Sequence, residues 1–401
     1  MRLLCNAASL HLPAMHTFAW FLRKFSPALV AVFFGFASLE VPSAWAQGRP
    51  TSPTPSALAK AQTKVKAQKA TTKIQKRAKR DKVLVGKAFG NTPAVKALAA
   101  EMAQQHGLKA EWVQLQLAGA HLLPQVQQMI MPAAAPSAKN WAAYRARFIE
   151  PQRLEAGVQF WRSHEADLQR AEQTYGVPAR YIVGILGVET YFGQHQGQFK
   201  VMDALATLSL AFPKEHRQAE ERVAFFKNEL GLWLKQCAQN PALKNQLGSY
   251  AGAIGWPQFM PSSIAKFAVD FDNDGRIDLS KSSADAIGSV AHYFKAYGWQ
   301  TGMPTHFEVD MKAQGTALEA LLAPDIVPSW SVAHLTAQQV ALSDAGRTFG
   351  GPLALVELFN GNDAPSYVAG TENFFVVTRY NRSSYYALAV IELGEAIEKA
   401  R

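Results

Sequence analysis

One carboxyl group in this chain of 401 residues has the surroundings that acid–base chemistry requires. Glu189 lies near the end of residues 176–193, GVPARYIVGILGVETYFG, and the only cation in that stretch is Arg180. On a helix, Glu189 would lie over Ile185 and Leu186. A carboxyl on an apolar face is either paired or keeps its proton to an unusually high pH, because burying its charge alone is costly. Glu189 is therefore a candidate general acid near neutral pH, with a core-edge Glu that reaches water as the alternative.

A second stretch combines glycines with ring, hydroxyl and amide side chains. It is residues 248–263, GSYAGAIGWPQFMPSS. Glycine lets a backbone approach a ligand closely, and aromatic rings and amides suit the faces and N-acetyl groups of sugars. The side chains in question are Ser249, Tyr250, Trp256, Gln258 and Phe259. A plain turn between helices is the alternative, and this stretch alone favours it.

Residues 270–278, DFDNDGRID, match the first half of an EF-hand calcium loop. Oxygen ligands recur at loop positions 1, 3 and 5, glycine follows at 6, and position 7 offers a backbone carbonyl. Position 12 is Lys281, which cannot be the closing ligand, whereas Asp285 at position 16 could close a longer loop. We predict one structural calcium ion here rather than an empty Asx-rich turn. The predicted ligands are Asp270, Asp272, Asp274, the Arg276 carbonyl and Asp285.

The elements that must position these residues are mainly helical. Apolar spacing predicts two helices within 89–123 that separate at Gly107, with six residues facing inward: Val95, Leu98, Met102, Val113, Leu115 and Leu117. One long amphipathic helix is predicted over 151–175, and others over 203–212, 220–239, 285–299 and 386–399. Strand composition at 307–309, 354–358 and 374–380 predicts a small β-sheet region at about 305–380. The last strand would place Tyr380 and Asn381 at a strand end, where site residues often lie.

The first 46 residues have the features of a secretory signal peptide. Arg23 and Lys24 precede an apolar run at 28–37, and a small-x-small pattern permits cleavage after Ala46. A membrane anchor is the alternative, but the apolar run is too short to cross a bilayer. Because Cys5 does not lie at a small-residue cleavage point, we expect a periplasmic protein that is not a lipoprotein.

Residues 47–82 carry a charge equal to the net charge of the whole chain, +10. Lys and Arg recur throughout this segment against the single acid Asp81, and few of its residues can pack in a core. This composition is typical of a disordered linker, with weak contact to an anionic surface as an alternative role. The remaining chain is close to neutral, so composition does not support a nucleic-acid partner.

The ordered motifs resemble the lytic murein transglycosylase B family, family 103 of the glycoside hydrolases. The resemblance runs from about residue 83 to the C-terminus and is carried by GVPARYIVGILGVETYFG, DALATLSLAFP, GSYAGAIGWPQFMPSS, VDFDNDGRIDL, DAIGSVAHYFKAYGW and NFFVVTRYNRSSYYALAV. It implies a mainly α (α+β) fold, with a lysozyme-like helical core, an additional helical region and a small β-sheet region. It also implies cleavage, without water, of the β-1,4 bond between N-acetylmuramic acid and N-acetylglucosamine in peptidoglycan, which leaves a 1,6-anhydromuramoyl end.

Carried over residue by residue, the resemblance implies that Glu189 is the sole catalytic acid and base and that catalysis needs no cofactor. The residues implied to line the glycan cleft are Tyr144, Ser249, Gln258, Tyr293, Tyr380, Asn381, Tyr386 and Arg222. The sequence departs from the family pattern in two places. The calcium loop is one residue longer before Asp285, and the stretch after Pro213, which contains Arg222, is also longer.

Two alternative functions remain open at this point. One is a hydrolytic muramidase on the same scaffold, in which water attacks in place of the C6 hydroxyl group. The other is a catalytically silent wall-binding scaffold that uses the basic segment and the cleft aromatics; the intact Glu189 argues against it. We expect a monomer that acts on peptidoglycan glycan strands, with wall-synthesis proteins as further candidate partners.

Overall fold

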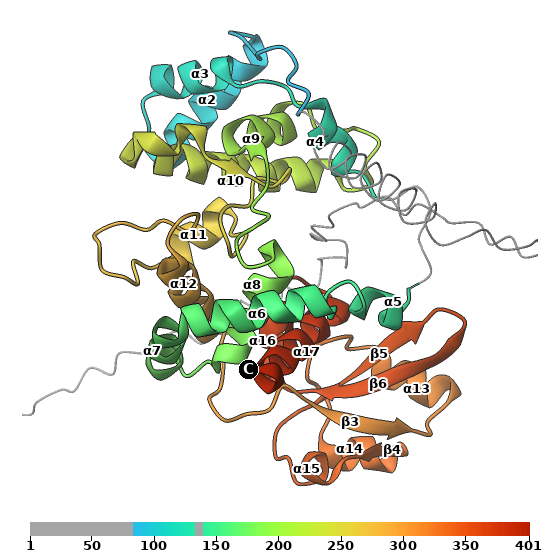
Figure 1. The fold of residues 1–401 in the computed structure, drawn as a ribbon. Helices are drawn as coiled ribbons and strands as arrows, with labels where there is room; N and C mark the ends of the chain where they lie inside the picture. Colours follow the sequence, from blue (N-terminus) through green and yellow to red (C-terminus); the bar gives the residue numbers. More distant parts are fainter. Residues whose placement is uncertain (1–82, 133–138) are drawn as a thin grey trace, which may run out of the picture.

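The computed structural model describes residues 83–132 and 139–401, which form three packed groups of elements (Figure 1). An upper helical lobe lies above a central helical lobe, and a small antiparallel sheet with short helices lies below. The signal peptide predicted over 1–46 and the linker predicted over 47–82 lie outside the described residues. Within the described ranges, no helix has both the length and the apolar character that a membrane span requires.

The upper lobe packs helices from two separate parts of the chain. Its elements are α2 (Pro93–His106), α3 (Ala110–Gly119), α4 (Pro124–Met129), α9 (Val201–Leu210), α10 (Ala219–Gln239) and the 3₁₀ helix η2 (Pro241–Asn245). Gly107 ends α2 in the left-handed conformation, as predicted. The prediction for Leu115 is wrong, because this side chain is 69% exposed. Val113 and Leu117, one helical turn apart, form the buried face of α3, and Leu115 lies on the opposite face.

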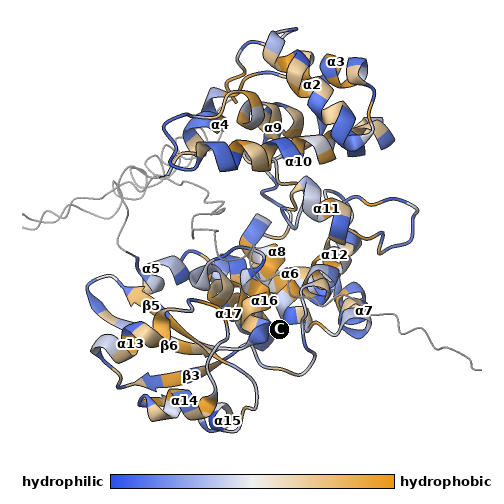
Figure 2. Cartoon of the chain, turned by 180° about the vertical axis from the view of Figure 1, so that it is seen from behind, coloured by the Kyte–Doolittle hydropathy of each residue, from blue (hydrophilic) through white to orange (hydrophobic). Residues whose placement is uncertain are grey.

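The central lobe surrounds α8 with other helices. Its elements are α5 (Trp141–Arg145), α6 (Pro151–Ser163), α7 (Glu165–Tyr175), α8 (Ala179–Thr190), α11 (Pro261–Phe267), α12 (Ser283–Ala296), α16 (Glu372–Thr378) and α17 (Ser384–Ala400). Seen from behind, hydrophobic residues gather where α8 and α16 lie beside α17 (Figure 2). The single helix predicted over 151–175 is wrong, because α6 ends and α7 begins at His164. The His164 ring lies 3.2 Å from the Ser283 hydroxyl, 119 residues away in the sequence, a contact that the helical period cannot reveal.

The lower part contains a four-stranded antiparallel sheet in the order β4-β3-β6-β5. Its elements are β3 (His306–Met311), β4 (Val340–Leu342), β5 (Ala354–Asn360) and β6 (Asp363–Gly370), with α13 (Gly315–Leu322), α14 (Val332–Ala337) and α15 (Asp344–Arg347). A two-stranded sheet, β1 (Phe199–Lys200) and β2 (Leu247–Gly248), joins the start of α9 to the 248–263 stretch. The predicted strands at 307–309 and 354–358 are confirmed, as is a mainly helical fold with small sheets.

The predicted strand at 374–380 is wrong, because these residues begin within helix α16. The Thr371 side chain caps this helix by accepting a hydrogen bond from the Asn373 amide. The Asn373 side chain then bonds the Gln300 and Met303 carbonyls, which anchors the helix start. Tertiary contacts therefore override the strand preference of the β-branched residues, and Tyr380 follows a helix rather than a strand.

Helices α8 and α17 approach closely at two glycines. A side chain at Gly184 of α8 would collide with the Val390 carbonyl oxygen of α17. A side chain at Gly394 of α17 would collide with the Arg180 carbonyl oxygen. The two helices can therefore pack this closely only because both positions are glycine and have no β-carbon.

We expect Gly184→Ala to lower the free energy of unfolding by about 2 kcal/mol, because an added methyl group must force α8 and α17 apart. The matched control is Gly119→Ala at the end of α3, where no atom lies within 4 Å of the new β-carbon. The control should be neutral, or stabilising by up to about 1 kcal/mol. Urea unfolding monitored by circular dichroism measures both, and equal stability of the two variants would contradict the close packing.

Candidate active site

Glu189 lies in the last turn of α8, at the edge of the central core. Nine of the twelve residues of α8 are buried, whereas Glu189 is only half-buried. The helix ends because Tyr191 and Phe192 both adopt the left-handed conformation. The Thr190 hydroxyl donates to the Trp256 carbonyl (2.9 Å) and accepts from the Gly193 amide (3.0 Å). These bonds fix the end of α8, and with it Glu189, against the 248–263 stretch.

Four tyrosines from separate elements gather around Glu189. The Tyr386 hydroxyl, from α17, donates a hydrogen bond to Glu189 Oε1. The Tyr293 hydroxyl donates to the Arg379 carbonyl (2.7 Å), and the Tyr380 hydroxyl donates to the Pro257 carbonyl (2.6 Å). The rings of Tyr293 and Tyr380 lie 4.8 Å apart, and those of Tyr380 and Tyr386 stack 6.4 Å apart. Tyr144, Tyr293, Tyr380 and Tyr386, predicted as cleft residues, are thus brought together with Glu189.

The surroundings of Glu189 shift its protonation toward neutral pH. Desolvation raises the pKa of the Glu189 carboxyl to about 7, while the hydrogen bond from Tyr386 opposes this rise by favouring the carboxylate. The Glu189 charge also adds to the raised pKa of all four tyrosines, for which burial is the larger cause. Glu189 is thus the carboxylate that acts on all four phenols. The arrangement is that of one carboxyl able to give up and regain a proton near pH 7.

Gln258 lies beside this cluster, immediately after Pro257. Its Nε2 donates to the carbonyls of Gly255 (2.9 Å) and Gln196 (3.2 Å), and its backbone is left-handed. Its Oε1 is buried and has no hydrogen-bond partner among the residues that the structure describes. An acceptor held in this way can receive a hydrogen bond from a ligand without reorganising.

The other predicted cleft residues are placed differently. The Ser249 hydroxyl is buried and accepts from the amides of Ala251 (3.3 Å) and Ala253 (3.0 Å), so it shapes the local turn. Asn381 is half-exposed just after Tyr380. Arg222 is buried in α10 of the upper lobe, within electrostatic range of Tyr250 rather than among the tyrosines around Glu189.

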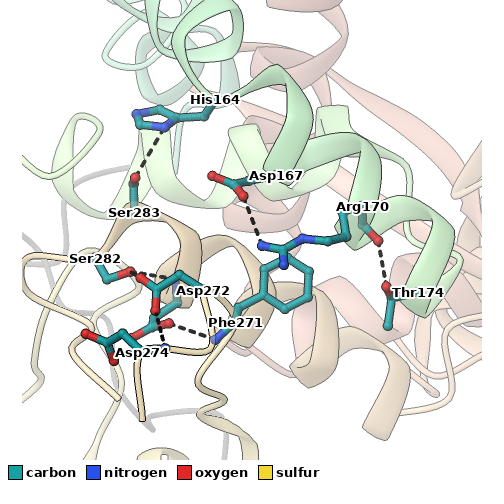
Figure 3. Close-up of polar contacts among 10 residues, drawn as sticks. His164, Asp167, Arg170, Thr174, Phe271, Asp272, Asp274, Ser282 and Ser283 are labelled. Atoms are coloured by element: carbon teal, nitrogen blue, oxygen red, sulfur yellow. Dashed lines mark hydrogen bonds and ion pairs between the residues drawn. The ribbon is translucent and has the colours of Figure 1, made fainter. Parts of the chain in front are cut away.

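The acidic loop folds onto the start of α12 (Figure 3). Ligand atoms of Asp270, Asp272 and Asp285 lie within 4.8 Å of one another. The buried Asp285 carboxylate accepts from the amides of Phe271 and Asp278, both at 2.8 Å. Asp274 lies outside this group, with its carboxylate accepting from the amide of Arg276 (2.8 Å). Three clustered carboxylates form a hard oxygen donor set of the kind that calcium prefers.

A guanidinium group from α7 packs on the acidic loop. The guanidinium of Arg170 lies 4.0 Å from the centre of the Phe271 ring and pairs with Asp167 at 3.0 Å (Figure 3). The loop is thereby held against α7 as well as α12.

Sequence reasoning missed Thr190 and the Pro257 carbonyl, which fix the end of α8 and the ring of Tyr380. Thr190 directly follows the acid, so its position was a usable signal. No sequence signal pointed to the Pro257 carbonyl, because its partner Tyr380 is 123 residues away in the sequence.

We expect Glu189→Gln to stabilise the protein at alkaline pH. The folded protein holds a proton on Glu189 up to a pKa of about 7, against an ordinary value of 4.5. The stability that this proton contributes is therefore complete below pH 4.5 and is lost as pH rises through 7. Because Glu189 is half-buried, we expect the variant to gain about 1–2 kcal/mol over the native chain between pH 5 and 8.5.

Urea unfolding at these two pH values measures this gain. The control is Glu111→Gln on the exposed face of α3, which should differ from the native chain equally at both pH values. A pH-independent difference for Glu189→Gln would contradict the raised pKa.

Comparison with known proteins agrees with this geometry. Residues 90–395 match the model of the transglycosylase SLT domain family. The membrane-bound lytic murein transglycosylase B of Escherichia coli K12 is 38% identical over 333 residues, covering 79% of this chain and 86% of the relative. The E. coli lytic transglycosylase SLT35 in complex with calcium matches at 35% identity, with a TM-score of 0.67 over 80% of this chain and 97% of that structure.

A third match is SltB3 of Pseudomonas aeruginosa in complex with NAG-NAM-pentapeptide. It is 28% identical, with a TM-score of 0.62 over 77% of this chain and 80% of that structure. The similarity extends through the upper lobe, the central lobe and the lower sheet, since the matched family region runs from the start of the upper lobe into α17. The chain therefore belongs to the transglycosylase SLT domain family.

Proposed function

We propose that this chain is a lytic murein transglycosylase. It cleaves the β-1,4 bond between N-acetylmuramic acid and N-acetylglucosamine in peptidoglycan without water and leaves a 1,6-anhydromuramoyl product. The observation that carries the proposal is the half-buried Glu189 carboxyl, with a pKa of about 7 and a hydrogen bond from Tyr386. Most glycosidases flank the bond with two carboxylates, whereas here one carboxyl stands among phenols.

One carboxyl suffices if the substrate supplies the other groups. Protonated Glu189 gives its proton to the oxygen of the leaving N-acetylglucosamine as the glycosidic bond breaks. The acetamido oxygen of the muramoyl residue stabilises the positive charge at C1. The Glu189 carboxylate then takes the proton of the C6 hydroxyl, whose oxygen bonds to C1 and closes the anhydro ring. Glu189 ends protonated, ready for another cycle.

The residues around Glu189 have supporting roles. The rings of Tyr293, Tyr380 and Tyr386 offer flat apolar surfaces that suit sugar faces and exclude water. The unpartnered Gln258 Oε1 is the acceptor we assign to a substrate N–H or hydroxyl group. Ser249, Asn381 and Arg222 remain predicted cleft residues, with Ser249 or Asn381 as the candidate that positions the acetamido group.

We further propose that the acidic loop holds one structural calcium ion. Asp270, Asp272 and Asp285 supply the clustered carboxylates, and Asp274 and the Arg276 carbonyl complete the predicted set. The relative SLT35 has been solved with calcium. The ion would cancel the repulsion between these carboxylates and tie the loop to α12, with no part in proton transfer.

The expected setting is the periplasm. We propose export through the signal peptide at 1–46 and action as a monomer on glycan strands that carry peptides, with the basic segment 47–82 as a linker and weak contact with an anionic surface as its alternative role. Support comes from the composition of these segments and from SltB3, whose ligand is a muramoyl pentapeptide. Wall-synthesis proteins remain candidate partners.

The deciding experiment is mass spectrometry of the soluble products after incubation of residues 47–401 with peptidoglycan. We expect muropeptides that are lighter by one water than reducing ends, and none from Glu189→Gln. The exposed Glu111→Gln variant is the matched control and should retain activity. Reducing ends would establish a hydrolytic muramidase instead, and retained binding without any release would establish a silent scaffold.

A separate measurement tests the calcium proposal. Millimolar calcium should raise the melting temperature of the native chain by several degrees, because an ion that binds only the folded state stabilises it. Asp272→Asn should remove this shift, while Asp344→Asn on the exposed start of α15 should keep it. An equal calcium response in all three proteins would rule out this loop as the site.

A further inference from the structure

We infer that Arg147 binds a carboxylate of the peptide carried by the muramoyl residue, on a shelf formed by Tyr144 and Phe148 beside Glu189. This inference rests on the proposed function and specifies how the same site would select peptide-bearing strands.

The shelf is built by the turn that follows α5. The amide of Arg147 bonds the Tyr144 carbonyl (3.1 Å), and the amide of Phe148 bonds the Arg145 carbonyl (3.0 Å). The turn places the Arg147 guanidinium carbon 5.9 Å from the centre of the Tyr144 ring, over its face. The Phe148 ring lies 5.2 Å from the same ring. Arg147 is exposed, but the ring beneath it restricts where its charge can lie.

Tyr144 connects this shelf to the acid. Its phenol experiences the negative charge of Glu189 and the positive charge of Arg147, with opposite effects on its pKa. The Tyr144 phenol also contributes to the raised pKa of Tyr386, whose hydroxyl donates a hydrogen bond to Glu189. Arg147 therefore packs on a ring that the charge of Glu189 reaches, and Arg153, which packs on the neighbouring Phe148 ring, bonds the Gly187 carbonyl two residues before Glu189.

Arg147 is distinguished from its neighbours by its lack of an acidic partner. Arg145 pairs with Glu392 of α17, and Arg153 lies 4.0 Å from Glu150. Among the described residues, Arg147 takes part in no ion pair. The other two arginines hold α5 and α6 in place, whereas the Arg147 guanidinium is available to a ligand.

A second guanidinium extends the positive edge of the shelf. Arg153 lies 5.2 Å from the Phe148 ring centre and 4.8 Å from that of Tyr191, and it donates to the Gly187 carbonyl (2.9 Å). Two positive groups thus flank the ring pair of Tyr144 and Phe148. The rings and N-acetyl groups of the sugars carry no charge, whereas a guanidinium matches a carboxylate with two parallel hydrogen bonds.

The muramoyl residue brings such a carboxylate to the site. Its peptide begins on the sugar whose bond breaks, so the carboxylates of the peptide are confined near Glu189 when the bond is in place. A peptide-free muramoyl residue instead exposes the carboxylate of its lactyl group. We assign the peptide carboxylate to Arg147, and substrates with and without peptides distinguish it from the lactyl carboxylate.

The test compares three substrates: strands with peptides, the same strands with their peptide carboxylates converted to methylamides, and peptide-free strands. We expect Arg147→Gln to lower kcat/KM about tenfold on the first substrate only, the loss expected for one charge-assisted contact. Arg147→Lys should recover part of this activity, because a lysine keeps the charge but not the paired geometry. The matched control is Arg162→Gln, an exposed arginine of α6 that bonds the Arg401 carbonyl and should behave as the native chain.

Binding of the same substrates to full-length chains that carry Glu189→Gln, with and without Arg147→Gln, is the second readout. A loss of affinity that depends on the peptide would support a carboxylate site at Arg147 even if the native chain proved hydrolytic or inactive. The binding measurement therefore tests Arg147 independently of the proposed reaction. Equal losses on all three substrates would overturn it, because Arg147 would then act through Tyr144 and Glu189. A loss confined to peptide-free strands, or no loss at all, would also overturn it.

Discussion

The desolvated carboxyl of Glu189 is the constraint on which the site depends. Burial against α8 and the phenols disfavours its charge, while the hydrogen bond from Tyr386 supports it, and the balance leaves a pKa of about 7. A carboxyl poised in this way is available both as an acid and as a base near neutral pH. A guanidinium in direct contact with the carboxyl would lower this pKa, and the guanidinium of Arg147 packs over the Tyr144 ring.

Close packing holds this balance in place. The acid and its hydrogen-bond partner come from α8 and α17, and the glycines at 184 and 394 allow these two helices to touch through backbone. The bond from Thr190 to the Trp256 carbonyl ties the end of α8 to the 248–263 stretch, and the bond from Tyr380 to the Pro257 carbonyl ties the segment between α16 and α17 to the same stretch. A small shift of either helix would change the distance between Glu189 and Tyr386, and with it the pKa.

The acidic loop contributes to the same site from a distance. Asp285 and Tyr293 both belong to α12, which begins at the loop and carries Tyr293 two turns later into the tyrosine cluster. The packing of Arg170 on Phe271 holds the other side of the loop against α7. A calcium ion bound at the loop would thus restrain the helix that supplies one wall of the site.

Sequence alone determined the features that depend on local spacing. The unpaired acid in an apolar helix, the DxDxDG run, the helix break at Gly107 and the strands at 307–309 and 354–358 follow from residue type and period. Only the tertiary structure decided that 374–378 is helical, that the helix at 151–175 breaks at His164, and that Tyr386 bonds Glu189 from 197 residues away. These outcomes depend on contacts between distant segments, whose free energies exceed the local preferences of less than about 1 kcal/mol per residue that a sequence pattern reports.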